Sequence, residues 1–568
     1  MAKVRQLEIK NFRSIKNLIW NPSSGMNCLI GHGDAGKSTI LDSLDIALGS
    51  RRSYPFSDAD FYCMDTTHPI EIYVTLGELD EQLKSIELYG HFLRSYSPIT
   101  QVIYDEPAVG NETVITIKLS IQEDLEPEWL LFSQRALSSG IERRLQWSHR
   151  ELISPSRLGA TSTYHLAWGH RSILNKLSEE SLNVSANLSN VARQARALFA
   201  QNQPQDITRV LDQVSAVATK MGVPIKNLQA HLDVNSVSLS NGAIALHNED
   251  NTPLKQLGTG STRLLISGLQ KAASKSSILI IDEAEYGLEP YRITRLLNEL
   301  GSKESNPDKQ VFLTTHSPYV LRELSANQLN VVRLLNDDHK IYNLGNGDTE
   351  QATLRACAEA FLSKDVLVCE GKTEIGLMRG FDLFLQSKNK DLFSSGLFCA
   401  DGGGDSMFER ANVFARLGYK TAIFKDSDKS SEHSKLQKEA ENNGITIFEW
   451  GNNHATENIL FSSLSKDLII KLLNYAIERK GRDAISSHIL TLSNNTLNLD
   501  QCLNNFTNEM RTTLGSISKK KGWYKDIEPA EYIMREIIAP NYTDISQELT
   551  ATINNLYIWI KTNKKDMI

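Results

Sequence analysis

Residues 31 to 38 read Gly-His-Gly-Asp-Ala-Gly-Lys-Ser and satisfy the pattern G-x-x-x-x-G-K-[ST] at every fixed position. A glycine-rich loop that opens a helix presents backbone N–H groups to phosphate oxygens. In such a loop, Lys37 would reach the β- and γ-phosphates of ATP, and the Ser38 hydroxyl would hold Mg²⁺. The predicted ATP-binding residues of this loop are Gly31, Gly33, Asp34, Ala35, Gly36, Lys37, Ser38 and Thr39.

A second group of candidate residues follows two apolar runs further along the chain. The run 278–281 ends in Asp282 and Glu283, and the run 311–313 leads to His316. An aspartate at the end of a buried strand suits Mg²⁺, and the following glutamate is placed to polarise the attacking water. His316 would sense or contact the γ-phosphate. A lone histidine is usually structural, but its order after the two phosphate-site motifs favours the functional interpretation.

Carboxylates also end apolar runs in the C-terminal half. Glu370 follows the run 366–369, with Glu374 four residues later, and Asp426 and Asp428 follow the run 421–424. Parallel strands gather such residues beyond their carboxyl ends. Clustered carboxylates repel one another unless a cation neutralises them, and their hard oxygens select Mg²⁺, with Mn²⁺ as a substitute. Two such ions can activate water for phosphodiester cleavage. A solvated turn is the alternative for any one pair alone.

Two further features could join this acidic site. Glu457 lies in Thr-Glu-Asn-Ile-Leu, at the predicted start of a helix, and the run 519–525 is Lys-Lys-Lys-Gly-Trp-Tyr-Lys. A lysine there would stabilise transition-state charge on a phosphate, with Lys521 as the first choice and Lys525 as the second. The alternative is a solvated run of charge.

Strands and helices must position these groups. We expect a strand at 26–30, a helix at 37–48, and an antiparallel β-region that includes 70–76 and 113–119, where apolar and polar residues alternate. Residues 165–230 show looser, more polar helical spacing. We interpret this insertion as a dimerisation arm, with a helical cap on the core as the alternative.

The order of these motifs resembles an ABC-type ATPase head over residues 1 to about 335. The opening Asn-Phe-Arg-Ser-Ile resembles RecF, Rad50 and SMC proteins, in which an arginine approaches the nucleotide; Arg13 is therefore a candidate, or else a surface arginine on a hairpin. Asp58 or Asp60 stands near the family's glutamine loop, although a simple acidic turn is the better interpretation. The signature loop departs from Leu-Ser-Gly-Gly-Gln, with Gly258 and Ser261 in place of serine and glutamine, so Thr259 or Ser261 would have to supply a hydroxyl.

The strand-Glu-Gly-x-x-Glu and strand-Asp-x-Asp combination resembles the Toprim domain of topoisomerases, primases and related nucleases, which places Glu457 at another acidic ligand position of Toprim nucleases. An ABC-type ATPase followed by a Toprim domain is the architecture of the OLD (overcoming lysogenization defect) family. The resemblance implies an α/β fold, ATP and Mg²⁺ as cofactors, and a DNA endonuclease or nickase governed by its ATPase. It further implies antiphage defence, a homodimer or higher oligomer, and a defence partner such as retron RNA or DNA or a companion protein. A catalytic set would be Glu370, Glu374, Asp426, Asp428, Glu457 and Lys521, with Glu283 for ATP hydrolysis.

Two other functions stay open: a RecF-like ATP-dependent DNA-binding or repair protein without nuclease activity, and a strand-passing or primase enzyme. No segment supplies the tyrosine-bearing domain that a topoisomerase requires.

Composition sets the outer bounds. At 568 residues, we expect several domains, divided as 1–160 and 236–335 (ATPase), 161–235 (helical insertion), 336–362 (linker), 363–535 (Toprim) and 536–568 (tail). A net charge of −7 argues against a globally basic DNA-binding surface but leaves room for a local one. Scattered cysteines and the lack of a long apolar run or signal peptide predict a cytoplasmic protein without a membrane segment.

Overall fold

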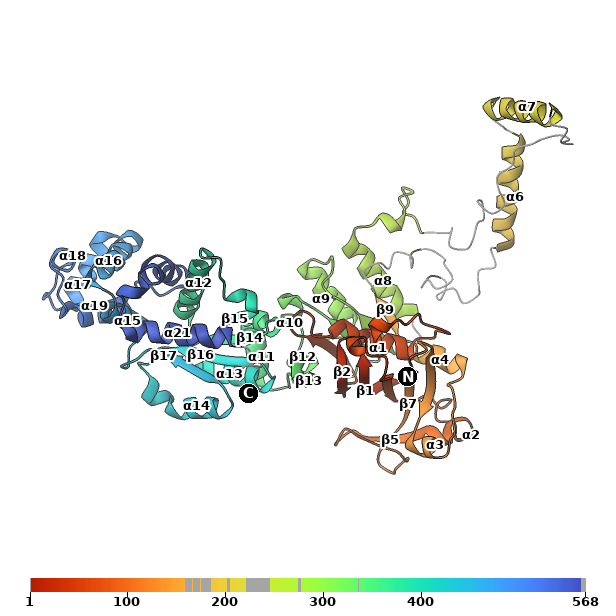
Figure 1. Cartoon of the computed structure of the whole chain (residues 1–568), viewed down its shortest axis with the longest axis horizontal. Coiled ribbons are helices and arrows are strands. Elements are labelled where there is room, and N and C mark those ends of the chain that lie inside the picture. The colour runs from red at the N-terminus through yellow and green to blue at the C-terminus, as the bar shows by residue number, and fades with distance from the viewer. Residues whose placement is uncertain are drawn as a thin grey trace.

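The computed structural model describes residues 2–158, 166, 174, 185–201, 205–220, 246–273, 277–335 and 337–562. Within these residues the strands form a seven-stranded, a six-stranded and a four-stranded sheet. Figure 1 shows the first two sheets in one half of the molecule, and the third with a cluster of helices in the other half. The predicted α/β class is therefore confirmed.

The seven-stranded sheet is antiparallel and follows the order β2-β1-β4-β7-β5-β6, with β8 also paired to β7. Its first two strands form the hairpin expected at the N-terminus, and β4 and β7 confirm the predicted alternating strands. The strands are β1 (Lys3–Phe12), β2 (Ile15–Trp20), β4 (Ile70–Gly77), β5 (Leu93–Ser97), β6 (Val102–Tyr104), β7 (Glu112–Ile121) and β8 (Pro127–Phe132). Short helices border this sheet: α2 (Ile86–Tyr89), α3 (Gln134–Ser138) and α4 (Trp147–Ile153).

The six-stranded sheet carries the nucleotide motifs and has the order β13-β12-β3-β11-β10-β9. It is parallel except where β12 meets β13. Its strands are β3 (Met26–Ile30), β9 (Ser156–Leu158), β10 (Ile278–Ile281), β11 (Gln310–Thr314), β12 (Leu329–Leu335) and β13 (Asp338–Asn343). Its helices are α1 (Lys37–Leu48), α8 (Thr259–Ala273), α9 (Pro290–Glu299) and α10 (Pro318–Glu323). The strand and helix predicted on either side of the glycine-rich loop are confirmed.

Residues 337–362 of the interval 336–362, predicted as a linker, form part of the fold. β13 pairs with β12 at the edge of the sheet, and α11 (Asp348–Ala356) follows. Leu354 and Phe361 are fully buried in one apolar cluster that also contains Val331 of β12 and Val366 of the next sheet. The interval is mostly polar, so its few apolar residues gave no clear sequence signal. These residues join the two halves of the protein through one continuous hydrophobic core.

The four-stranded sheet is parallel, in the order β15-β14-β16-β17. Its strands are β14 (Asp365–Cys369), β15 (Leu397–Asp401), β16 (Lys420–Lys425) and β17 (Thr446–Glu449), and its connecting helices are α12 (Lys372–Gln386), α13 (Met407–Arg416) and α14 (Ser430–Asn442). The central strands β14 and β16 are almost wholly buried, which explains why they read as continuous apolar runs.

Helices make up the rest of this half; in Figure 1 α21 runs beside the sheet, and α16 to α19 gather at the far end of this half. They are α15 (Thr456–Ser463), α16 (Lys466–Lys480), α17 (Arg482–Leu492), α18 (Leu499–Asn504), α19 (Met510–Lys521), α20 (Ile527–Tyr532) and α21 (Gln547–Lys561). The interval 536–568, predicted as a tail, includes α21, which buries Leu549, Ile553 and Leu556 in the core of this half. Its apolar residues recur at helical spacing and therefore pack inward.

Most of the predicted helical insertion lies outside the described residues. Two of its helices are described, α6 (Ser185–Gln201) and α7 (Gln205–Lys220), and both stand away from the sheets in Figure 1. The dimerisation arm stays a prediction. No helix of the described part of the chain has the length and apolar composition needed to cross a bilayer.

Candidate active sites

The glycine-rich loop between β3 and α1 adopts the backbone that a phosphate cradle needs. Gly31 and Gly36 have φ values of 143° and 83°, and Asp34 is also left-handed at 59°. The Lys37 ammonium lies inside the loop and donates to the carbonyl oxygens of Gly31 at 3.1 Å and His32 at 2.9 Å. Burial lowers the pKa of Lys37. A phosphate would replace these carbonyl oxygens as the hydrogen-bond partner of the buried Lys37 ammonium.

Asp282 lies where β10 ends, next to Ser38. Its Oδ1 accepts hydrogen bonds from Ser38 Oγ at 3.3 Å and from Thr314 Oγ1 at 2.6 Å. The structure thus brings together the two predicted Mg²⁺ contacts of the ATP site. Arg263 of α8 donates to the backbone oxygens of both Asp282 and Glu283, each at 2.7 Å, and so fixes the end of the strand.

Glu283 and His316 are both exposed. They follow the carboxyl ends of β10 and β11, which are neighbouring parallel strands. Glu283 has a left-handed φ of 50°, and its backbone N–H donates to Thr314 Oγ1 at 2.9 Å. The backbone N–H of His316 donates to Glu285 at 2.6 Å, and Thr315 Oγ1 donates to the same carboxylate at 2.7 Å. Glu285, which sequence reasoning did not single out, thereby shapes the turn that carries His316.

Arg13 lies against α1. Its guanidinium donates to Asp42 of that helix and, at 2.9 Å, to Asp60. Asp60, considered as an outer partner of Mg²⁺, is thus a partner of Arg13, whereas Asp58 is exposed. The contact of Arg13 with nucleotide stays a prediction.

Arg157 of β9 was missed by sequence reasoning, because a three-residue strand carries no motif. It donates to Asp42 and lies 3.5 Å from Asp45 and 3.7 Å from Asp282. A chain of ion pairs therefore connects α1 to Asp282, the aspartate that is predicted to hold Mg²⁺.

The signature-like loop opens α8. Ser261 Oγ accepts a hydrogen bond from Arg292 Nη1 at 3.1 Å. A Cβ on Gly260 would lie 2.5 Å from the Gly287 carbonyl oxygen, so this glycine permits the close approach of α8 to the segment after β10. A trans contact through Thr259 or Ser261 stays a prediction.

The acidic residues of the C-terminal half gather at the carboxyl ends of β14 and β16. Cys369 and Phe424 are register partners, so Glu370 and Asp426 leave neighbouring strands together. The backbone N–H of Asp426 donates to Glu370 Oε2 at 2.9 Å. Glu374, in the first turn of α12, accepts from the Gly371 N–H at 2.9 Å. The predicted convergence of these side chains is present.

Thr456, at the start of α15, lies between two of the carboxyl groups. Its Oγ1 is 3.0 Å from Glu374 Oε1 and 2.8 Å from Asp426 Oδ1, and it accepts a hydrogen bond from Trp450 Nε1 at 2.9 Å. One hydroxyl proton can be donated to only one of the two carboxyl groups, and Asp426 Oδ1 also accepts from the backbone N–H of Thr456 at 2.9 Å.

Burial and mutual repulsion hold these carboxyls partly neutral. Burial, reinforced by the charges of Asp426 and Glu370, raises the pKa of Glu374 to about 8. Burial and Glu370 raise the pKa of Asp426 to about 7. Burial also raises the pKa of Glu457, which faces Lys525, Lys519 and Asp428. The pKa values of these carboxyl groups are raised because burial and the neighbouring negative charges disfavour their charged forms.

The donor set is chemically suited to a hard divalent cation, since every charged ligand is a carboxylate. Its side chains are nevertheless held by N–H and hydroxyl groups, and no three His, Cys, Asp or Glu residues of the described chain are arranged to hold a metal ion as they stand. To bind one, Glu374 and Asp426 would release the Thr456 hydroxyl, and Glu370 would release the backbone N–H of Asp426. Asp428 and Glu457 would complete the set.

The structure places the lysines of the run 519–525 differently around the acidic site, and which of them is catalytic stays a prediction. Lys519, not Lys521, donates a hydrogen bond to Asp428, and both Lys519 and Lys525 face Glu457. Lys521 instead lies near His488, whose pKa it helps to lower. Residues two apart on a helix point to opposite sides, so Lys519 and Lys521, two of the three lysines that end α19, cannot both face the acidic site.

Comparisons with known proteins support the interpretation of the first half of the chain as an ATPase domain. The family described as "AAA domain, putative AbiEii toxin, Type IV TA system" matches residues 26–322, more than half of the chain. An OLD nuclease of Thermus scotoductus is 25% identical over 366 residues, 60% of this chain, and this chain spans 63% of that protein's length. An ATP/GTP phosphatase of Helicobacter pylori is 23% identical over 377 residues, which cover 60% of this chain and 94% of that protein.

Solved structures also align with the chain. The Smc head domain with an extended coiled coil from Pyrococcus furiosus is 13% identical, covering 60% of this chain and 96% of that one, at a TM-score of 0.33. The SMC head domain from Thermotoga maritima is 13% identical, covering 60% and 98%, at 0.29. The likeness to OLD nucleases expected from the order of motifs is confirmed by the curated relative. With its P-loop, its Asp282 strand and a family match over most of the first 322 residues, the chain belongs to this AAA-domain family.

Proposed function

We propose that this protein is an ATP-hydrolysing, Mg²⁺-dependent DNA endonuclease of the OLD type, in which the ATPase half regulates a Toprim nuclease half. The observation that carries the proposal is the convergence of Glu370, Glu374 and Asp426 at adjoining strand ends, with Lys519 held on Asp428. Divalent cations would stabilise these buried carboxylates by neutralising their charge. The same cations would bind the phosphate groups of a DNA backbone.

Each group in the acidic site has a role that its position supports. Glu370, Glu374, Asp426, Asp428 and Glu457 would hold Mg²⁺ or Mn²⁺. When bound, such ions activate water and stabilise the leaving oxygen of a phosphodiester. Lys519 lies at the exposed edge of the site, where its ammonium can leave Asp428 for a phosphate oxygen of DNA. Thr456 keeps Glu374 and Asp426 oriented toward each other.

In the ATP half, Lys37 would bind the β- and γ-phosphates, and Ser38 and Asp282 would hold the accompanying Mg²⁺. Glu283 would orient the attacking water, and His316 would contact the γ-phosphate from the next strand. The continuous core through Leu354 and Phe361 gives the ATP half a mechanical connection to the acidic sheet.

The biological setting that we propose is antiphage defence in the cytoplasm. The OLD nuclease relative supports the nuclease class, and pairing of ABC-type heads supports a homodimer or higher oligomer. A retron nucleic acid or a companion protein would be the trigger.

Cleavage of supercoiled plasmid with Mg²⁺ or Mn²⁺ tests the nuclease. We expect Asp426→Asn to lower the cleavage rate by roughly 10²-fold or more, because it removes charge that holds the catalytic cations. Asp544→Asn, at an exposed position of the same half, is the matched control and should cleave at the wild-type rate. Equal cleavage by wild type and Asp426→Asn would remove the acidic site from the chemistry. DNA binding without cleavage in either metal would favour the RecF-like alternative.

A further inference from the structure

A cavity of about 340 Å³ lies beside the antiparallel sheet, away from the motifs described above. Arg51 and Arg52, just beyond α1, line it together with residues of β7, β8, α4 and the segment before α4. Its volume falls in the range of roughly 300–1,000 Å³ that is typical of small-ligand sites. Its lining combines four arginines with the indoles of Trp129 and Trp147.

The arginines of this cavity have more positive charge than the protein neutralises. Arg51 pairs with Asp45, and Arg144 makes a solvent-exposed pair with Glu128 at 3.6 Å. Within the described residues, no carboxylate forms an ion pair with Arg52 or Arg150. Arg150 donates from Nε to the Gly49 carbonyl oxygen at 2.9 Å, whereas its Nη2 is buried without a hydrogen-bond partner.

Burial and the nearby Arg51 lower the pKa of Arg150 to about 10, as expected of a cation that lacks its anion. Unsatisfied buried guanidinium nitrogen is costly, and an anionic ligand would satisfy it.

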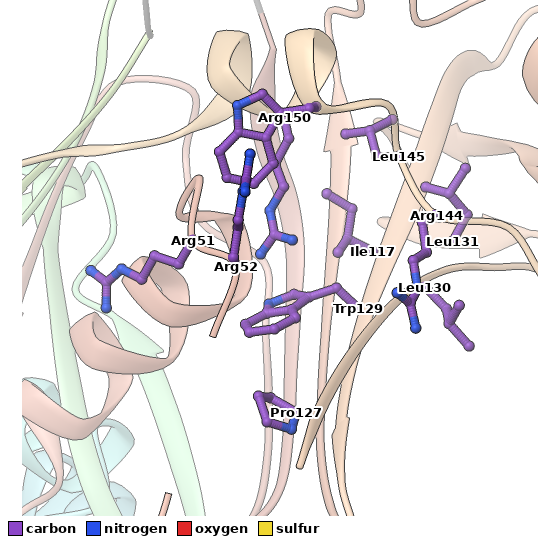
Figure 2. A pocket seen from close by; sticks show the side chains of 11 residues that line it. Arg51, Arg52, Ile117, Pro127, Trp129, Leu130, Leu131, Arg144, Leu145 and Arg150 are labelled. Atoms are coloured by element: carbon purple, nitrogen blue, oxygen red, sulfur yellow. The ribbon is translucent and has the colours of Figure 1, made fainter. Parts of the chain in front are cut away.

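The aromatic side chains give the cavity flat surfaces beside these charges. The Arg150 guanidinium lies 4.5 Å from the centre of the Trp129 ring, and the Arg52 guanidinium lies 5.6 Å from that of the Trp147 ring. Figure 2 shows Arg150 and Trp129 close together in the cavity. Trp147 is 42% exposed, so its ring is accessible to a second aromatic group. Guanidinium groups suit phosphate oxygens, and indoles suit the faces of nucleobases.

We propose that this cavity binds a nucleoside phosphate, with the phosphate on Arg52 and Arg150 and the base against the tryptophan rings. The ligand is either a free nucleotide or the end of a nucleic-acid strand, since both present this chemistry. The site is separate from the P-loop, and its occupancy does not depend on the proposed nuclease.

Calorimetric titration with AMP tests this site, because AMP lacks the β- and γ-phosphates that Lys37 is placed to bind. We expect wild type and Lys37→Ala to bind AMP with similar affinity, which would separate this cavity from the P-loop. Arg52→Ala and Trp147→Ala, both at exposed positions, should weaken binding about tenfold each, as expected from loss of a charged hydrogen bond or a stacked base. Arg143→Ala, an exposed arginine of the same segment that does not line the cavity, is the matched control and should bind AMP as wild type does.

Two further ligands show whether the base contributes to binding and whether the ligand is a free nucleotide or the end of a nucleic-acid strand. Ribose 5-phosphate should bind about tenfold more weakly than AMP if the base is stacked. A 5′-phosphorylated thymidine pentanucleotide that binds more tightly than AMP would identify the ligand as a nucleic-acid end, and weaker binding would identify a free nucleotide. The proposal is wrong if neither AMP nor the pentanucleotide binds wild type at millimolar concentration, or if Arg52→Ala and Trp147→Ala bind as tightly as Arg143→Ala.

Discussion

The Lys519 ammonium donates a hydrogen bond to the Asp428 carboxylate across 91 positions of sequence. Asp428 follows β16, and Lys519 belongs to the last turn of α19. The contact places the Lys519 cation at the edge of the acidic site. It also distinguishes Lys519 from the neighbouring lysines of the same run, which gives the first prediction.

We expect Lys519→Ala to lower the rate of metal-dependent DNA cleavage by about 10- to 100-fold, because transition-state charge on the phosphate loses its cation. Lys521→Ala, on the opposite side of α19, should cleave DNA at nearly the wild-type rate. Single-turnover cleavage of a labelled duplex measures both. Lys519→Arg keeps the charge and should recover part of the loss; if Lys521→Ala is instead the slower variant, the assignment of Lys519 is wrong.

The raised pKa values of Glu374 and Asp426 predict an unusual pH dependence for metal-free protein. The ordinary carboxyl pKa is about 4. At pH values between this and the raised pKa values, about 8 for Glu374 and about 7 for Asp426, the folded site holds protons that the unfolded chain releases. The stability that these groups contribute is fully present below about pH 4 and is lost as the pH rises to about 8. With EDTA present, Tm should therefore fall across this window.

Divalent cations should reverse this trend, because they bind the deprotonated carboxylates and release their protons. The increase in Tm caused by Mn²⁺ should grow from pH 5 to pH 8. Thermal unfolding with and without Mn²⁺ measures it. A Glu374→Gln, Asp426→Asn double variant should lose both the fall in EDTA and the Mn²⁺ effect, while Asp544→Asn keeps both. A Mn²⁺ effect that persists in the double variant would place the cation elsewhere.

The sequence predicted the parts of this molecule that depend on local pattern. The buried strands before Gly31, Asp282, Glu370 and Asp426 were recognisable because parallel strands covered on both faces read as apolar runs. The meeting of Glu370 with Asp426 followed from the topology of such strands. These features can be predicted without knowing which distant segments pack together.

Other parts depended on packing that no local pattern records. Three consecutive lysines do not reveal which of them faces Asp428, because the phase of α19 is set by buried Leu514 and Ile517. Thr456 carried no signal, since a threonine near a helix start is common. The interval 336–362, predicted as a linker, contains β13, which is recognisable only through its pairing with β12. The helical spacing of Leu549, Ile553 and Leu556 could have identified α21 from sequence alone.

The close approach of α12 to α20 predicts a stability effect. A Cβ on Gly380 would lie 2.2 Å from the Glu531 carbonyl oxygen, and one on Gly376 would lie 2.3 Å from that of Ile527. Gly380→Ala should therefore destabilise the protein by about 1–3 kcal/mol through overpacking. Gly268→Ala, at an exposed position of α8 where a Cβ meets nothing within 4 Å, should instead stabilise by about 0.5–1 kcal/mol. Urea denaturation measures both; a stabilising Gly380→Ala would contradict the tight packing.

Lys37 offers the clearest separation of the two halves. Because its ammonium is the cation inside the phosphate loop, Lys37→Ala should lower ATP turnover by about 10²-fold or more. Lys16→Ala, at an exposed position of β2, should hydrolyse ATP at the wild-type rate. Metal-dependent plasmid cleavage by Lys37→Ala should persist at least in part, because the acidic site forms within the other sheet. Phosphate release and plasmid nicking, measured on the same preparations, report the two activities. Wild-type ATP turnover by Lys37→Ala would refute the P-loop assignment, and complete loss of nicking would show that the acidic site requires an active ATPase.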